Sequence, residues 1–309
     1  MNVTSSSLIA NIMVYLSQLQ KMSERKHTMS PMHTPSGSHN QSKSSLGPQC
    51  PAPADIPTHP GLPAQPDFPA QPGLPAQPGL PIHSGLSVLP ALPAHPARLP
   101  RSFFTRDGIT LAKDLLGKIL VHETPLGTVR GIITEVESYM GETDKGSHTY
   151  GGKRTDRTEP MYHIGGTSYV YLIYGMYSCM NIAAMTEGIP QAALLRSVVP
   201  ADKESEERMI RLRLEQLNRR QVKKKLPPYI PETCPASVKK HLADGPGKLC
   251  IAMGISRKDN DVDMVESDSF YVTEGVDIAP EKILAGKRIG IDYAEEAADY
   301  LWRFYVETF

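Results

Sequence analysis

The stretch Val129-Arg-Gly-Ile-Ile-Thr-Glu-Val-Glu-Ser-Tyr139 decides the fold, because it predicts the long strand of a sheet. Lys118–His122 predicts a shorter strand before it, and the turn residues between the two segments predict a hairpin. Side chains alternate between the two faces of a strand, so we expect Glu135, Glu137 and Tyr139 to share one face.

The stretch Gly166-Thr-Ser-Tyr-Val-Tyr-Leu-Ile-Tyr-Gly-Met-Tyr-Ser-Cys-Met-Asn181 places four of the chain's 13 tyrosines within nine residues. Ser168–Tyr174 and Met176–Ala184 predict two strands with a bend between them, and Ala192–Val199 predicts a further strand that ends at Pro200. Tyrosines concentrated in this way, near an acid and a histidine, favour a pocket for a flat ring.

Helices are predicted on both sides of these strands. Thr110–Gly117 predicts a short helix with Thr110 as its N-cap and Gly117 at its C-terminal end, and Asp202–Lys225 predicts a long charged helix. Leu226–His241 contains four prolines and predicts a loop, whereas Asp244–Met253 predicts a glycine turn that opens a helix. Helices and strands mix without a regular βαβ rhythm, which favours the α+β class.

The first hundred residues differ from the rest in composition, because they hold 18 of the 28 prolines. From Pro63 to Leu80 they repeat a six-residue unit of the form Pro-Ala-Gln-Pro-x-x. Proline lacks an amide donor, so a solenoid of such short repeats could not bury a face. We therefore expect residues 1–101 to form a disordered tail and residues 102–309 to form a single folded domain.

The apolar patch Leu8–Leu19 is too short to span a membrane and lacks the features of a secretory signal. An organelle presequence stays open as an alternative. The four cysteines, at positions 50, 179, 234 and 250, have no zinc-site spacing, so we expect no metal site and a reduced, intracellular chain. Residues 101–309 carry 28 basic and 30 acidic residues, which counts against a generic nucleic-acid binder.

Several residues are candidates for chemistry from the pattern alone. Glu137 beside Tyr139 is a candidate general base. The alternative is a solvent-exposed strand residue without a catalytic role. Tyr139, His148 and Tyr171 are candidate walls of a ring-binding slot, although tyrosines also pack in sheet cores. Arg196 lies inside an apolar strand, so it predicts a carboxylate or phosphate partner nearby.

Two further candidates concern nucleic acid. Tyr174 and Met176 flank Gly175 at a predicted hairpin tip, where large apolar residues either tuck into the core or form a wedge between DNA bases. Gly245-Pro-Gly-Lys248 lacks the spacing of a nucleotide-hydrolysing phosphate loop but suits one backbone phosphate.

The order and spacing of five motifs resemble those of the alkyladenine DNA glycosylases, the mammalian type of 3-methyladenine DNA glycosylase. The motifs are Arg130–Gly141, Ser147–Gly152, Tyr169–Ile182, Ala193–Arg196 and Gly245–Cys250. The resemblance covers roughly residues 103–306 and implies a single mixed domain around a curved antiparallel sheet with packed helices. Leu226–His241 does not match the family pattern, and residues 292–300 are acidic where DNA contacts are expected.

The resemblance implies an enzyme that flips an alkylated or deaminated purine out of duplex DNA and hydrolyses its N-glycosidic bond. Glu137 matches the general base that activates water, Arg196 matches a residue that holds this water, and His148 lies beside it. No nucleophilic lysine is required, so the product is an intact strand with an abasic site. The resemblance implies no metal or organic cofactor.

The resemblance also assigns the residues that hold the base and the duplex. Tyr139, His148 and Tyr171 match the walls that sandwich the flipped base, and Asn181 matches the pocket residue that disfavours the guanine amino group. Tyr174 matches the residue that fills the hole in the duplex, with neighbours at Met176 and Tyr177, and Lys248 matches a contact to the backbone.

Two other functions stay open. The first is a catalytically silent protein that binds lesions, and the second is a scaffold whose Pro-Ala-Gln repeats dock SH3-like protein partners. For the enzyme we expect a monomer in the nucleus, because its partner is double-stranded DNA and because Arg219–Lys225 is a dense basic run.

Overall fold

The computed structural model describes residue 92, residues 96–173 and residues 175–307. The predicted disorder of the tail, the Pro63–Leu80 repeat, the presequence at Leu8–Leu19 and the predicted wedge residue Tyr174 lie outside the described residues. Residues 98–101, which composition places in the tail, contact the domain: Leu99 is buried, and its amide donates to the carbonyl of Val272.

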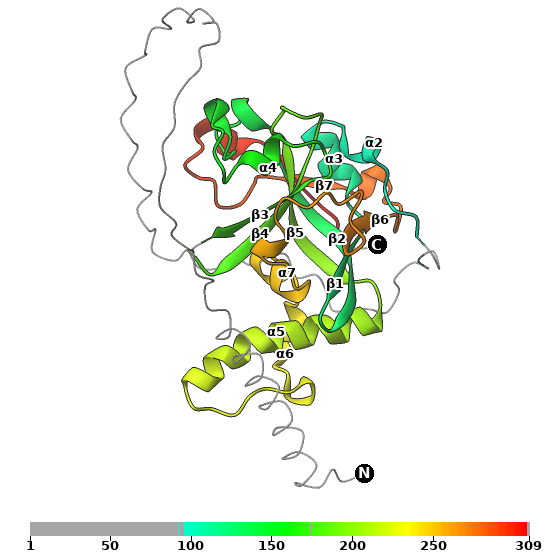
Figure 1. Ribbon diagram of the computed structural model, residues 1–309, viewed down its shortest axis with the longest axis vertical. Helices are drawn as coiled ribbons and strands as arrows, with labels where there is room; N and C mark the ends of the chain where they lie inside the picture. The colour runs from blue at the N-terminus through cyan, green and yellow to red at the C-terminus, as the bar shows by residue number, and fades with distance from the viewer. Residues whose placement is uncertain (1–91, 93–95, 174, 308–309) are drawn as a thin grey trace, which may run out of the picture. The chain divides into compact units, whose positions relative to one another are not determined.

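One curved antiparallel sheet organises the domain (Figure 1). The strands follow the order β3-β4-β5-β2-β1-β6, and β8 pairs with both β2 and β7. Their bounds are β1 Ile119–Thr124, β2 Gly127–Tyr139, β3 Ser168–Ile173, β4 Tyr177–Ala183, β5 Ala192–Pro200, β6 Phe270–Thr273, β7 Leu284–Gly286 and β8 Arg303–Tyr305. The predicted α+β class with a curved antiparallel sheet is therefore confirmed.

The long strand β2 lies in the middle of the sheet and pairs with three neighbours, β1, β5 and β8. Its pairing with β5 is irregular, because Glu135 opposes Ser197 while Val136 opposes Leu195. Arg196 is thus the extra residue of a bulge on β5. Bulges change the direction of a side chain and occur beside active sites, so this irregularity bears on the position of Arg196.

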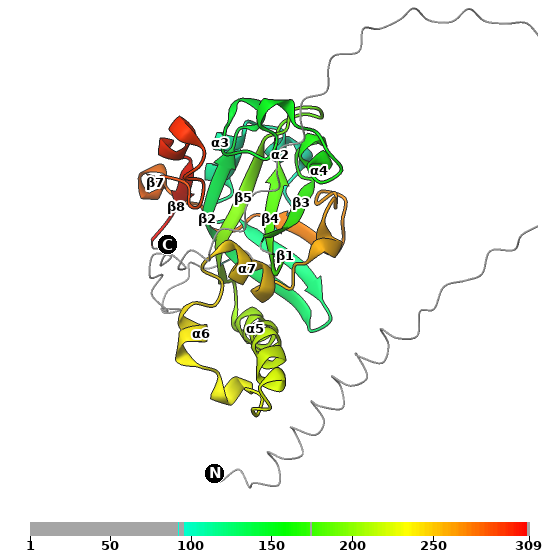
Figure 2. The ribbon, with the colours of Figure 1, turned by 90° about the vertical axis from the view of Figure 1, so that its left-hand side faces the viewer.

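Helices cover the sheet and close its core (Figure 2). Their bounds are α2 Arg101–Phe104, α3 Gly108–Asp114, α4 Glu159–Tyr162, α5 Lys203–Lys223, α6 Ala236–Lys240 and α7 Pro246–Ala252. Short 3-10 turns are η2 Gly141–Thr143, η3 Tyr150–Gly152, η4 Pro231–Thr233, η5 Arg257–Asp259, η6 Pro280–Lys282 and η7 Glu295–Asp299. The main core includes Leu111 of α3, Met209 of α5 and Leu249 of α7. None of the helices in these described residues is long and apolar enough to cross a membrane.

Two local predictions were wrong. Asp107, not Thr110, caps α3, because its carboxylate accepts from the amides of Ile109 and Thr110. The segment Leu226–His241 is not only loop, since it contains η4 and α6. The side chain of Asn218 on α5 exchanges hydrogen bonds with the backbone of Tyr229, which holds this proline-rich segment against the helix.

Candidate active site

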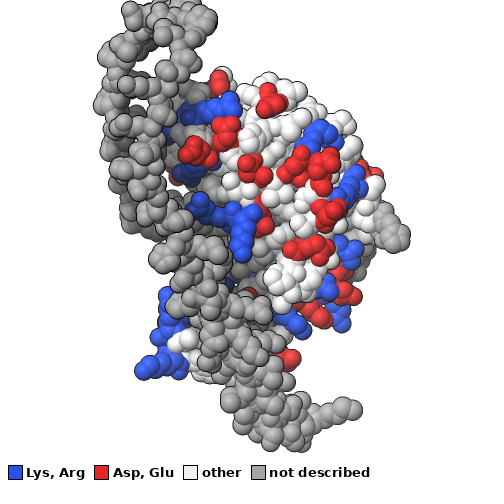
Figure 3. Space-filling view, viewed as in Figure 1, with Lys and Arg blue, Asp and Glu red and all other residues white. Residues whose placement is uncertain are grey.

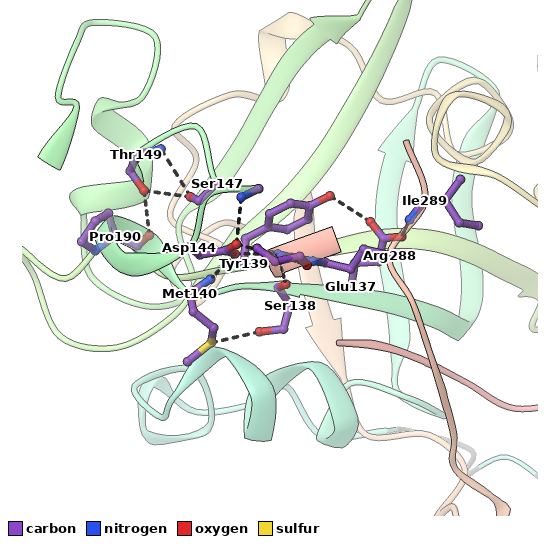
Figure 4. Close-up of polar contacts among 12 residues, drawn as sticks. Glu137, Ser138, Tyr139, Met140, Asp144, Ser147, Thr149, Pro190, Arg288 and Ile289 are labelled. Atoms are coloured by element: carbon purple, nitrogen blue, oxygen red, sulfur yellow. Dashed lines mark hydrogen bonds and ion pairs between the residues drawn. The ribbon is translucent and has the colours of Figure 1, made fainter. Parts of the chain in front are cut away.

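The carboxylate of Glu137 lies at the centre of the site and is fully buried. Its Oε1 accepts the amide of Ile289 at 2.8 Å and lies 3.2 Å from Nη1 of Arg196. Its Oε2 accepts the hydroxyl of Tyr139 at 2.9 Å (Figure 4). Two hydrogen-bond donors and one ion pair, from three different segments, therefore orient the carboxylate, and the prediction that Glu137 and Tyr139 share one face is confirmed.

Arg196 connects two carboxylates. Its Nε donates to Glu135 at 3.1 Å, and Arg303 of β8 donates to the same carboxylate oxygen at 3.1 Å. Burial by itself would lower the pKa of Arg196, but the charges of Glu137 and Glu135 raise it overall. Arg196 therefore stays charged next to Glu137, and the predicted carboxylate partner of this buried arginine is confirmed.

The backbone of Arg196 is fixed by the loop that leads into α7. The bulge leaves its carbonyl outside the ladder with β2, and this carbonyl accepts the amide of Gly245 at 2.9 Å. Ser197 forms an isolated bridge with Asp244 in the same loop. The motif of residues 245–248 thus supports the arginine of the site, a role that its sequence does not reveal.

The strand register explains why residues far apart in sequence meet here. Directly opposite residues of antiparallel strands share a face. Tyr169 opposes Asn181, Asn181 opposes Leu194, and Leu194 opposes Glu137. These four residues form one row across β3, β4, β5 and β2, which places Asn181 on the face of Glu137. The Asn181 side chain is buried, and its amide donates to the carbonyl of Tyr169 at 3.1 Å.

An aromatic wall stands on the same face. The rings of His148 and Tyr171 lie 4.7 Å apart at 73°, and those of Tyr169 and Tyr171 lie 5.2 Å apart. Nδ1 of His148 is 2.9 Å from the hydroxyl of Tyr169. Of the predicted slot residues, the structure brings His148 and Tyr171 into contact, while Tyr139 is held on Glu137.

Burial and nearby charges keep the side chains of His148 and Tyr139 neutral. Burial, followed by the positive charges of Arg157 and Lys153, lowers the pKa of His148 to about 4. Burial and then the charge of Glu137 raise the pKa of Tyr139 well above its usual value. At neutral pH the imidazole of His148 and the phenol of Tyr139 are therefore both neutral.

A buried ion pair between Arg288 and Asp144 supports the site from behind. Both side chains are fully buried, and the guanidinium makes two hydrogen bonds to the carboxylate. The guanidinium also lies 4.8 Å from the centre of the Tyr139 ring and 5.0 Å from that of Trp302, and it donates to the carbonyl of Ser138. This pair fixes the end of β2 and the segment that presents the Ile289 amide to Glu137.

The Asp144–Arg288 pair and the Ile289 amide were not predicted from the sequence. A backbone amide such as that of Ile289 leaves no signature in a sequence, and Asp144 and Arg288 are 144 positions apart. The acidic segment 292–300, where DNA contacts were expected, instead pairs with nearby lysines: Lys145 binds Glu295 and Glu296 at 2.6 and 2.9 Å. The same segment packs Ala294 and Ala297 against Tyr139.

The β3–β4 hairpin presents apolar side chains to solvent. Met176 is 67% exposed and Leu172 is 40% exposed. Gly175 has a positive φ of 64° at the tip, and the Met176 amide closes the turn on the carbonyl of Ile173. The bend predicted at this position is confirmed, and Met176 projects from it rather than packing in the core. Tyr177 accepts a hydrogen bond from Arg220 at 3.1 Å.

Lys248 lies on α7 and is already paired. Its ammonium donates to Asp244 at 2.9 Å, and the other oxygen of Asp244 lies 2.5 Å from Nδ1 of His241. The predicted phosphate contact of Lys248 thus stays a prediction. In the part of the chain that the structure describes, no three His, Cys, Asp or Glu side chains are placed to hold a metal ion.

The sequence of this chain is similar to those of known proteins. Residues 102–308 match the family model described as methylpurine-DNA glycosylase. A protein of Clostridium acetobutylicum named "Putative 3-methyladenine DNA glycosylase" is 47% identical over 210 residues, which cover 68% of this chain and 94% of the relative. Proteins of the same name from Clostridium perfringens and Clostridium tetani are 44% and 43% identical, and 68% of this chain aligns with 96% of each relative.

Proposed function

Since the chain belongs to the methylpurine-DNA glycosylase family and is a DNA glycosylase for alkylated bases, we propose that it flips a damaged purine out of duplex DNA and hydrolyses the N-glycosidic bond with water activated by Glu137. The hydrogen-bond geometry of this carboxylate is the observation that carries the proposal. An ionised carboxylate has about four acceptor positions. The Ile289 amide and the Tyr139 hydroxyl fill one position on Oε1 and one on Oε2. The Arg196 guanidinium faces the second position of Oε1 as an ion pair at 3.2 Å, which leaves a fourth position.

The fourth position, on Oε2, accepts a hydrogen bond from the attacking water. The water oxygen forms a bond to C1′ of the sugar while the bond from C1′ to the purine nitrogen breaks. The proton of the water goes to Glu137, and the electron pair of the broken bond goes to the base. An alkylated purine that carries positive charge leaves as a neutral molecule, so the reaction requires chiefly a base, a water and a site that excludes ordinary purines.

The aromatic wall supports binding of the flipped base. Stacking of a base on an aromatic ring contributes about 1–3 kcal/mol. His148 and Tyr171 supply ring faces on the Glu137 side of the sheet, and a neutral His148 does not repel a cationic base. Asn181 in the same row adds a polar group that reads the purine edge.

The exposed hairpin supports the step that opens the duplex. Met176 and Leu172 are large apolar side chains at a tip, which is where a wedge between base pairs is needed. Tyr174 stays a predicted wedge residue. Tyr177 opposes Ile173 next to the tip, and its hydrogen bond from Arg220 of α5 supports the hairpin there.

The enzyme is proposed to be monofunctional, meaning that it leaves the strand intact. Cleavage of the strand by a glycosylase requires an amine that attacks C1′. Within the described residues no lysine contacts Glu137, and the amines of Lys145 and Lys248 are bound by carboxylates. We also propose that the protein works as a monomer in the nucleus, where its substrate lies.

The test is single-turnover base release from a duplex that carries one hypoxanthine or one ethenoadenine. We expect the wild type to release the base and leave a strand that breaks only after alkali treatment. Glu137→Gln should slow release by roughly 10²- to 10⁴-fold while lesion binding persists. Glu207→Gln on the exposed side of α5 is the matched control and should behave like the wild type.

Each other outcome removes one part of the proposal. Release by Glu137→Gln at the wild-type rate would mean that another group is the base. Strand cleavage without alkali would exclude a monofunctional enzyme. Tight lesion binding with no release by either protein would favour the silent lesion-binding protein.

A further inference from the structure

The charges of the folded domain are unevenly distributed. Residues 219–240 carry seven basic residues and a single acidic one, Glu232. The other residues between 101 and 309 include 21 basic and 29 acidic ones. We call the seven basic residues the α5–α6 basic surface: Arg219, Arg220, Lys223, Lys224, Lys225, Lys239 and Lys240. Figure 3 shows Lys and Arg gathered at the lower left, where Figure 1 draws the end of α5.

All seven side chains belong to exposed residues. None of the seven forms an ion pair with a described residue, whereas basic residues elsewhere are commonly paired, as Arg208 is with Glu204 near the start of the same helix and Lys248 is with Asp244. The surface is therefore a local excess of positive charge on an otherwise acidic domain.

This excess is unfavourable for the isolated protein. Arg219 and Lys223, like Arg220 and Lys224, stand four residues apart on α5, and like charges at this spacing destabilise a helix by about 0.2–0.5 kcal/mol per pair. The dipoles of the two helices favour cations in their last turns, which offsets part of this repulsion at Lys223 of α5 and at Lys239 and Lys240 of α6. Lys225 lies beyond the end of α5 and gains less from the dipole. A bound polyanion would relieve the repulsion.

The basic surface is continuous with the β3–β4 hairpin. Arg220 donates to the hydroxyl of Tyr177, the first residue of β4, at 3.1 Å. Met176, the most exposed large apolar residue of the described chain, immediately precedes Tyr177. A duplex that places a lesion at the hairpin thus runs past the end of α5.

We propose that the α5–α6 basic surface binds backbone phosphates of duplex DNA on one side of the lesion, an inference that rests on the proposed function. Duplex DNA carries one phosphate charge per about 1.7 Å of its axis, and each neutralised phosphate releases counterions. Binding of the flanking duplex holds the hairpin and the site in register with the damaged base. It also explains how a slightly acidic domain binds a polyanion, because its positive charge is concentrated where the duplex lies.

The test compares two variants with the same loss of charge. Lys223→Gln, Lys224→Gln and Lys225→Gln together remove three charges from the basic surface, and all three residues are exposed. The control combines Lys203→Gln, Lys258→Gln and Lys282→Gln, which are also exposed and lie outside it. Binding of undamaged and lesion-containing duplexes is measured at several salt concentrations, together with the single-turnover release rate at saturating enzyme.

We expect the basic-surface variant to bind both duplexes roughly tenfold or more weakly at low salt, with a salt dependence reduced by about one unit of slope per lost phosphate contact. The control should bind like the wild type, and both variants should keep the saturated release rate. The loss should grow when the duplex is extended on one side of the lesion and stay constant when it is extended on the other.

Equal affinities and slopes for the wild type and the basic-surface variant would overturn the inference, as would equal losses in both variants. Unchanged DNA binding together with lost binding to vesicles that contain phosphatidylserine would assign the surface to a membrane instead. A wild type that binds DNA through this surface but releases no base would contradict the proposed function while leaving the inference intact.

Discussion

The Glu137 centre and the tip of the β3–β4 hairpin belong to one sheet but are opposites in environment. Glu137 is fully buried, accepts two hydrogen bonds and is paired with Arg196, whereas Met176 is 67% exposed. A group that acts on one bond must keep a fixed direction, and burial among donors provides this. A side chain that inserts into another molecule must not be packed within its own protein, and an exposed hairpin tip meets this requirement.

The two regions also differ in what they contribute to stability. Glu137, Arg196 and Glu135 are charges in a largely buried setting, so removal of one partner leaves the others uncompensated. The hairpin tip buries little, and its loss should leave the fold unaffected. The predictions below test this contrast between the two regions.

The largest effect is expected from Arg196→Gln, which removes the positive charge between Glu135 and Glu137. The free energy of unfolding should fall by about 3–5 kcal/mol, and base release should become slower because Glu137 loses its ion-pair partner. Lys287→Gln breaks the exposed pair with Asp299 and should cost no more than about 1 kcal/mol. Chemical denaturation measures the free energy of unfolding of both variants. Similar losses of this free energy would contradict the expectation that the buried ion pairs stabilise the fold more than the exposed pair.

Asp144→Asn is expected to have the next largest effect. It leaves the buried Arg288 guanidinium without its anion, which should destabilise the fold by about 3 kcal/mol. The segment that holds Arg288 should also shift and misplace the neighbouring Ile289 amide. The saturated release rate should therefore fall roughly tenfold, while the affinity for lesions stays the same. Under conditions where the variant is folded, an unchanged saturated rate would show that the pair is structural only.

Met176→Ala tests the other side of the contrast. Its free energy of unfolding should stay within about 0.5 kcal/mol of the wild type, because the side chain is exposed. Lesion affinity should fall roughly tenfold, which corresponds to about 1.4 kcal/mol. Leu284→Ala on β7 changes a partly exposed side chain elsewhere and serves as the control. A Met176→Ala protein that is destabilised but binds lesions normally would contradict the wedge.

The smallest effect concerns His148, which should titrate at about 4 in the folded protein. An unfolded histidine titrates near 6.5, so the unfolded state binds more protons between these values. Stability should therefore decrease as the pH falls from about 6.5 to 4. An NMR titration of the imidazole measures its pKa, and Arg157→Gln should raise it by removing a neighbouring positive charge. A titration midpoint near 6.5 would mean that the imidazole is more exposed to solvent than the structure shows.

The sheet was largely predictable because its signal is local. The hairpin of β1 and β2, the bend before Tyr177 and the strand that ends at Pro200 all appear as apolar and β-branched runs bounded by turn residues. The helix cap at Asp107 was missed because two residues near the start of α3 carry side chains that cap well. Helix α6 was missed because the prolines around it mark loops more strongly than its five residues mark a helix.

The candidate site was predictable only in part. Alternation along β2 brought Glu137 and Tyr139 together, and the cost of burying Arg196 required a partner. Two contacts could not be predicted from the sequence pattern: the ion pair between Asp144 and Arg288, and the hydrogen bond from the Ile289 amide to Glu137. Both join segments about 150 positions apart.

The amino-acid sequence by itself determined strands β1 to β5, the long helix α5 and the family, because residue propensities and motif spacing act within short segments. Only the tertiary structure decided which segments meet at Glu137. The register of four strands sets Tyr169, Asn181 and Glu137 in one row, and a bulge directs Arg196 toward the two carboxylates. These positions depend on pairing between distant strands, and a shift of one residue would turn every side chain of a strand to the other face.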